Sequence, residues 1–81
     1  MRDELRSPRH EALRKLLKLE RQKAELTQTE LAKRIGWPQT TISDIEVGEK
    51  RVSVLELIAI GEALGLDPAA WVRRIAKVPE E

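Results

Sequence analysis

Apolar residues recur at helical spacing in five separate segments of this 81-residue chain. No segment shows the strict alternation of apolar and polar residues that marks a half-buried strand. The pattern therefore predicts an all-α fold with five helices in one domain, at residues 8–76. Residues 1–7 and 77–81 carry no such pattern, and they are expected to form an N-terminal and a C-terminal tail.

Capping signals mark the ends of the expected helices. A polar side chain that can cap a helix precedes four of them: Ser7, Thr27, Ser53 and Asp67. The second and third of these caps begin the capping boxes "TQTE" and "SVLE", whereas the other two stand before a Pro that suits the first helical turn. Glycines that can end a helix in the left-handed conformation are Gly36, Gly48 and Gly65. The third helix has no polar cap, and we expect it at about 38–46, with Trp37 as its cap.

Each expected helix carries an apolar face that can contribute to a shared core. These faces consist of Leu13, Leu16, Leu17 and Ala24; Leu31, Ala32 and Ile35; Ile42 and Ile45; Val54, Leu57, Ile58, Ile60, Gly61 and Leu64; and Trp71, Val72 and Ile75. A core of this size fits a small domain whose stability should be modest.

Composition narrows the class of protein. Apolar residues make up 41% of the chain, which is enough for a globular core. There is no Cys, and His10 is the only histidine, so a metal site is not expected and His10 is expected at the surface. No apolar run could span a membrane, and the charged N-terminus contains no apolar leader, so we expect a cytoplasmic protein.

Charge is unevenly distributed, although the net charge is only +1. Residues 1–25 contain eight Lys or Arg against five Asp or Glu, whereas residues 54–81 contain three against five. A locally basic surface can attract a polyanion even on a nearly neutral protein. The basic first helix can equally be an ordinary solvated surface, and the sequence leaves both interpretations open.

The third expected helix combines an apolar side with a polar side. If Ile42 and Ile45 face the core, the outward residues are Gln39, Thr40, Ser43 and Asp44, flanked by Thr41. Such side chains suit base edges in the DNA major groove, because Gln can pair with adenine, Thr can contact thymine and Asp can accept from cytosine. The two short helices around Gly36 also have helix-turn-helix spacing. The alternative is a solvated helix surface without a ligand.

The stretch "TQTELAKRIGWPQTTISDIEVGEKRVSVLELIAIGEALGLD" resembles the Cro/phage-repressor (XRE) family of helix-turn-helix proteins. The shared pattern runs Thr-Gln, an acidic residue, Leu-Ala, Gly, Ile-Ser, Glu, Gly and a Leu-rich fourth helix that ends Ala-Leu-Gly. The resemblance covers about residues 10–72. It implies a compact, five-helix, lambda-repressor-like domain whose second and third helices form the motif. It also implies binding of double-stranded operator DNA, usually as a two-fold dimer.

The resemblance implies a role for particular residues. The implied base-reading residues are Gln39, Thr40 and Asp44. The implied phosphate or backbone contacts are Gln28, Thr41, Ser43, Lys50 and Arg51, with Thr41 and Ser43 available to a base as well. Gln28 can also brace Gln39. An ion pair between Arg21 and Glu46 is implied to fasten the third helix to the first without touching DNA.

Three positions depart from the pattern of the family. Pro38 stands where a Ser cap is frequent, Glu25 where a Gly is common, and Asp44 where a long polar or basic residue is common. Asp44 would be repelled by phosphates, so it either reads a cytosine, points aside or weakens binding. Trp37, beside the turn, either packs on the second helix or lies against the DNA backbone.

Small and apolar residues also lie outside the expected core faces of the last two helices. They are Leu55, Ala59 and Ala63 on the fourth helix, and Ala69 and Ala70 at the start of the fifth. Trp71 is expected in the core or at an interface. We predict a dimer or partner interface that includes Leu55, Ala59, Ala70 and Trp71, against the alternative of scattered exposed apolar residues, which are normal.

These observations predict a transcriptional regulator, expected to be a repressor, that binds a palindromic operator as a homodimer. The alternative is an antitoxin-like or restriction–modification-controller-like protein that binds a protein partner through its fourth and fifth helices. An enzyme is not expected, because the chain has no Cys, no Tyr, one His and no convergent pair of acids. No cofactor is expected, and the protein should be cytoplasmic and nucleoid-associated.

Overall fold

The computed structural model describes residues 6–80, and this range contains five helices and no strand. The helices are α1 (Pro8–Lys23), α2 (Gln28–Ile35), α3 (Gln39–Val47), α4 (Val54–Leu64) and α5 (Pro68–Ala76). The all-α prediction is therefore confirmed.

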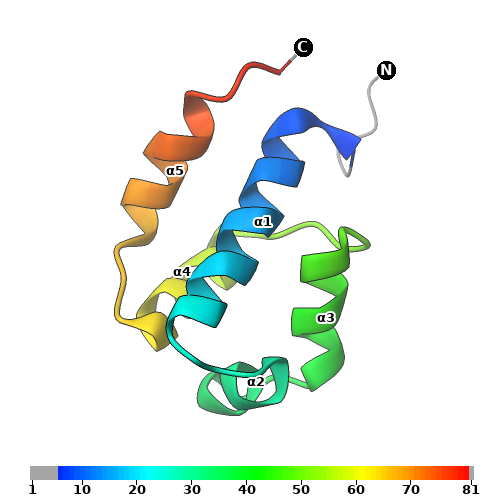
Figure 1. Ribbon diagram of the computed structural model, residues 1–81, viewed down its shortest axis with the longest axis vertical. Helices are drawn as coiled ribbons and strands as arrows, with labels where there is room; N and C mark the ends of the chain where they lie inside the picture. Colours follow the sequence, from blue (N-terminus) through cyan, green and yellow to red (C-terminus); the bar gives the residue numbers. More distant parts are fainter. Residues whose placement is uncertain (1–5, 81) are drawn as a thin grey trace.

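The helices surround α1, which crosses the middle of the molecule with α5 on one side and α3 on the other (Figure 1). Helix α2 packs against α3 and α4, and α4 also packs against α5. The end of the chain is tied to the start of α1, because Arg9 donates hydrogen bonds to the carbonyls of Ala76 and Val78 at 3.1 and 2.9 Å. None of the described helices is long and apolar enough to cross a membrane.

Local capping chemistry explains where most helices begin. The expected caps each accept a hydrogen bond from a backbone N–H of the first turn, and both capping boxes are complete. The prediction for α3 is wrong by one residue, because Pro38 is its cap and Gln39 its first residue. Pro38 keeps an extended backbone, with ψ 145°, and α3 has no side-chain cap. Its first-turn N–H groups therefore lack the partner that a Ser cap would supply.

Four residues of the described range have a left-handed backbone: Glu25 and the three glycines expected to end helices, Gly36, Gly48 and Gly65. Gly36, between α2 and α3, has φ 87°, a conformation that glycine adopts without steric cost. Glu25, after α1, has φ 59° although it carries a side chain. The departure from glycine at Glu25 therefore leaves a left-handed turn in place, at a cost of roughly 1–2 kcal/mol for an L-residue.

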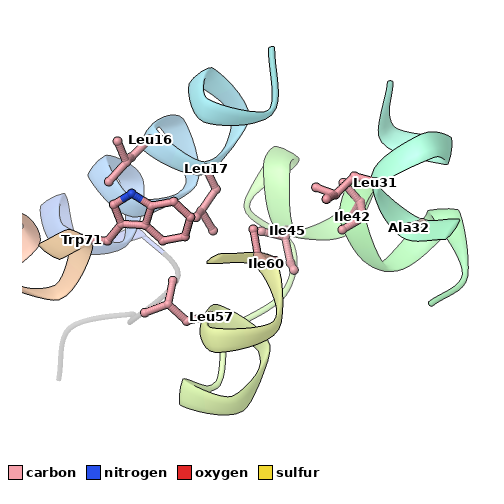
Figure 2. Close-up of a cluster of buried hydrophobic side chains, with 9 residues drawn as sticks. All are labelled: Leu16, Leu17, Leu31, Ala32, Ile42, Ile45, Leu57, Ile60 and Trp71. Carbon is pink, nitrogen blue, oxygen red and sulfur yellow. The ribbon is translucent and has the colours of Figure 1, made fainter. Parts of the chain in front are cut away.

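The core lies where all five helices meet (Figure 2). Its buried residues are Leu16, Leu17, Leu31, Ala32, Ile42, Ile45, Leu57, Ile60 and Trp71. Figure 2 shows the indole of Trp71 beside the two leucines of α1 and Leu57 of α4. Leu31 of α2 lies beside Ile42 of α3. The buried residues of α3 are Ile42, Ile45 and Glu46, which lie on one side of the helix, so only this side is anchored in the fold.

Some burial predictions are wrong. Four residues that were assigned to core faces are exposed: Ala24, Val54, Ile58 and Val72. Ala24 lies at the C-terminal cap of α1, beyond the packed helices. Helix α4 is apolar almost all round, so its sequence could not show that only the narrow side with Leu57 and Ile60 faces the core. Ala63, which was placed outside that side, packs against the core.

Two further assignments are corrected. Trp71 is only 5% exposed and belongs to the core, so its side chain is not part of an exposed interface. His10 was expected at the surface, but both nitrogens of its ring are buried and receive no hydrogen bond from any residue in the described range.

Candidate nucleic-acid interface

Helix α3 presents its polar residues on the side opposite its core contacts. Ile42 and Ile45 are 2% and 1% exposed. Gln39 and Thr40, at the start of the helix, are exposed. The remaining candidates are half-buried: Thr41, Ser43 and Asp44. The first turn of α3 is thus the part of the candidate surface most open to a large ligand.

A chain of hydrogen bonds joins α1, α2 and α3 beneath this surface. Arg21 donates from Nε and Nη2 to the two carboxylate oxygens of Glu46, at 2.6 and 2.9 Å. Gln28 donates from Nε2 to Glu46 Oε1 at 3.0 Å. Gln39 then donates from Nε2 to Gln28 Oε1 at 2.8 Å. The residues that the resemblance singled out as the ion pair and the brace thus form one connected network.

The ion pair at the base of this network is buried. Arg21 and Glu46 are 8% and 7% exposed, and Arg21 Nη1 also donates to the carbonyl of Leu26 at 2.7 Å. The hydrogen bond to Glu46 raises the pKa of the Arg21 guanidinium. Burial raises the pKa of the Glu46 carboxyl, but hydrogen bonds from Arg21 and Gln28 outweigh it, so this pKa lies below its ordinary value. Both groups are therefore charged at neutral pH.

The lowered pKa of Glu46 predicts a loss of stability in acid. A carboxyl with a lower pKa in the folded state stabilises the fold above its ordinary pKa, 4.5, and this contribution is lost as pH falls through the folded-state pKa. We expect the free energy of unfolding to fall more steeply below pH 4.5 in the wild type than in the double variant Arg21→Met/Glu46→Leu. Urea titrations at a series of pH values measure both curves, and parallel curves would contradict the prediction.

Lys50 and Arg51 lie in the loop after α3. Lys50 Nζ is 2.8 Å from Glu56 Oε2, so an ion pair already compensates its charge. Burial by itself would raise the pKa of the Glu56 carboxyl. Hydrogen bonds from Lys50 and Ser53 have the larger, opposite effect, so the pKa of Glu56 lies below its ordinary value. This pair was not predicted from the sequence. The signal was present in the capping box "SVLE", because a capping-box carboxylate lies near the start of its helix, where the loop arrives.

The remaining candidates divide between the core and the surface. Trp37 is half-buried and packs against the core. Leu55 is 78% exposed, Ala70 is exposed and Ala59 is half-buried. Exposed apolar side chains also gather between α4 and α5, and we name the following set the α4–α5 patch: Val54, Leu55, Ile58, Ala69 and Val72. A shallow hollow runs between these two helices.

Comparisons with known proteins agree with this architecture. A family model described as "Helix-turn-helix" matches residues 17–71, which reach from α1 to α5. Among solved structures, a match is an XRE-family like protein from Pseudomonas syringae pv. tomato str. DC3000, with 38% sequence identity and a TM-score of 0.79. The match covers 84% of this chain and 83% of that chain. The comparison with curated proteins found no match.

Proposed function

The chain belongs to the XRE-type helix-turn-helix family of DNA-binding regulators, and from this premise we propose that it represses transcription by binding a palindromic operator as a homodimer. The observation that carries the proposal is the first turn of α3, where Gln39 and Thr40 are exposed while the opposite side of the helix is fixed in the core. In a helix-turn-helix motif the second of the two helices, here α3, enters the major groove. The proposed location that goes with this role is the nucleoid, in the cytoplasm.

Base reading is assigned to one side of α3. Gln39 can pair with adenine through one donor and one acceptor, and Thr40 can contact the methyl group of thymine. Asp44 lies one helical turn after Thr40, and its carboxylate can accept from cytosine N4, whereas its negative charge would be repelled by phosphates.

Backbone contacts are assigned to the residues around this surface. They are Gln28, Thr41, Ser43, Lys50 and Arg51. The first turn of α3, which has no side-chain cap, adds backbone N–H groups and the positive end of the helix dipole, both of which favour phosphate. Such contacts supply most of the affinity and depend strongly on salt, whereas base contacts supply the discrimination.

Selection of binding sites from a random pool of double-stranded DNA tests the proposal. An inverted repeat, with half-sites about one helical turn apart, is the expected result because a two-fold dimer places two α3 helices in successive major grooves. Absence of any enriched sequence, with a folded protein, would contradict sequence-specific binding.

Lys50→Ala should weaken binding to every sequence. A phosphate contact contributes about −0.9 to the slope of log K against log salt, but Lys50 must first leave Glu56, so we expect the slope to change by less than that. Binding measured by fluorescence anisotropy at several salt concentrations gives the slope. The matched control is Glu56→Gln, which keeps the size of the capping residue and releases Lys50, so it should strengthen binding. An unchanged slope in Lys50→Ala would remove Lys50 from the interface.

Leu55→Glu should shift the protein from dimer toward monomer. Leu55 is 78% exposed within the α4–α5 patch, and a charge buried in an apolar interface without a partner is costly. The control Leu19→Glu introduces the same charge at an exposed leucine of α1, 44% exposed, and should leave the dimer intact. Sedimentation velocity over a range of concentrations separates the two species. Equal behaviour of both variants would place the dimer interface elsewhere.

The α4–α5 patch also supports a second candidate function. The same exposed apolar side chains could receive a protein partner in place of a second copy of the chain. A wild-type protein that sediments as a monomer at every concentration would favour this candidate over the homodimer.

A further inference from the structure

We propose that Glu46 sets the base preference of Gln39 by fixing the direction of the hydrogen bonds that pass through Gln28. The proposal rests on the base-reading role of Gln39 proposed above. Glu46 lies at the far end of α3 from Gln39 and would act as a positioning residue, not as a DNA contact. Its influence would reach the surface through one side chain of α2.

The direction of the hydrogen bonds follows from the chemistry of a carboxylate. An ionised carboxylate has no proton and can only accept, so Gln28 must turn its NH₂ group toward Glu46. With its NH₂ group held at Glu46, Gln28 turns its carbonyl oxygen, at the other end of the planar amide, toward Gln39. An oxygen can only accept, so Gln39 donates to it, at 2.8 Å. The orientation of both amides is thus a consequence of the negative charge at Glu46.

The carboxylate itself is held in one position. Two hydrogen bonds from Arg21, at 2.6 and 2.9 Å, hold both of its oxygens. Arg21 is anchored in turn by the carbonyl of Leu26. Since both charged groups are more than nine-tenths buried, water cannot readily replace Arg21 or Gln28 as a partner.

The donation from Gln39 limits what its amide can offer to DNA. A glutamine amide carries two N–H donors and one oxygen acceptor, and here one N–H is bonded to Gln28. One donor and one acceptor remain, the pattern that adenine matches with N7 and N6. If the hydrogen bond between the two glutamines had the opposite direction, Gln28 would donate to the oxygen of Gln39. Both N–H groups of Gln39 would then be free to contact DNA. That second pattern matches the two acceptors of guanine, N7 and O6.

The test replaces the charge with a group that can either donate or accept. In the double variant Arg21→Met/Glu46→Gln, position 46 is neutral, both directions become available, and no charge is left buried without its partner. Competition binding compares operators with A·T or G·C at the base pair where Gln39→Ala changes preference. We expect the adenine-to-guanine affinity ratio to fall about fivefold at that pair, the equivalent of one neutral hydrogen bond, with other pairs unchanged.

A second variant and a control keep the result unambiguous. Gln28→Met breaks the connection but leaves the ion pair intact, so it should retain the fold and lower the same ratio. Ile60→Val removes one buried methyl group from a side chain that takes no part in the hydrogen bonds of the network. It should leave the ratio unchanged, although it also destabilises the domain.

The outcomes separate the inference from the proposed function. If Gln39→Ala alters preference at one base pair but the double variant and Gln28→Met leave the adenine-to-guanine ratio there unchanged, the inference is wrong and base reading stands. If the double variant weakens binding equally at all sequences, Glu46 has only a structural role and the inference is also wrong. Gln28→Met is expected to lose its proposed phosphate contact at every sequence, so for this variant only the adenine-to-guanine ratio decides. If Gln39→Ala alters no base pair, base reading itself fails and the inference falls with it.

Discussion

Replacing Glu46 with alanine is expected to lower the free energy of unfolding by about 3–5 kcal/mol, because it leaves a buried guanidinium without its carboxylate. Arg21 would retain only the carbonyl of Leu26 as a partner, and Gln28 would lose its acceptor. A domain of this length has a total stability of about 4–12 kcal/mol, so the variant should be largely unfolded or marginally stable. Urea unfolding followed by circular dichroism measures the loss.

The double variant Arg21→Met/Glu46→Leu is the control for this prediction. Buried ion pairs replaced by apolar residues of similar volume are often neutral in stability, so we expect this variant to be much more stable than Glu46→Ala. An exposed ion pair contributes less than about 1 kcal/mol. If Glu46→Ala lowers the free energy of unfolding by no more than this, the buried ion pair does not hold α3 in place.

Replacing Gln39 with alanine is expected to cost about 1–3 kcal/mol of binding free energy on the selected operator. The loss should be confined to one base pair in each half-site, because Gln39 is the exposed residue that begins α3 and its amide is pre-oriented by Gln28. Fluorescence anisotropy with the operator and its single-pair variants gives the affinity for each sequence. At the pair that Gln39 contacts, the variant should bind all four base pairs with similar affinity.

Gln22→Ala is the matched control for this substitution. Gln22 is also an exposed glutamine, but it lies near the end of α1 and outside the proposed interface. Its replacement should leave affinity and specificity unchanged. A uniform loss at every sequence in Gln39→Ala would assign Gln39 to phosphate contact and not to base reading.

Helix boundaries were predictable because their causes are local. A Ser or Thr followed three residues later by Glu can satisfy free N–H groups in any fold, and both capping boxes begin helices at the expected residues. The start of α3 was less predictable, because no side chain there competes for the free N–H groups. The backbone of Pro38, which stays extended, decides the boundary instead.

Burial in α4 was not predictable from its sequence. Val54 and Ile58 are as apolar as Leu57 and Ile60, but the first pair is exposed and the second is buried. A helix that is apolar almost all round has no distinct apolar face in its sequence. The neighbouring helices therefore decide which of its sides is buried.

The candidate site was predictable in its residues and less so in its connections. Spacing alone placed Gln39 and Thr40 outward on α3, whereas the pairing of Arg21 with Glu46 came from a family resemblance. The hydrogen bond from Gln28 to Glu46 and the ion pair between Lys50 and Glu56 escaped prediction. Each joins side chains from different segments, and only the packing of the helices brings them within reach.

Binding to an operator that carries 7-deazaadenine tests the central claim, major-groove reading by α3, most directly. This base lacks N7 and keeps the Watson–Crick edge, so it removes one major-groove acceptor at a chosen pair. At the pair contacted by Gln39, the wild type should lose about fivefold in affinity, the value of one hydrogen bond, whereas Gln39→Ala should lose nothing further. An equal loss in both proteins, or no loss in either, would contradict major-groove reading of adenine by Gln39.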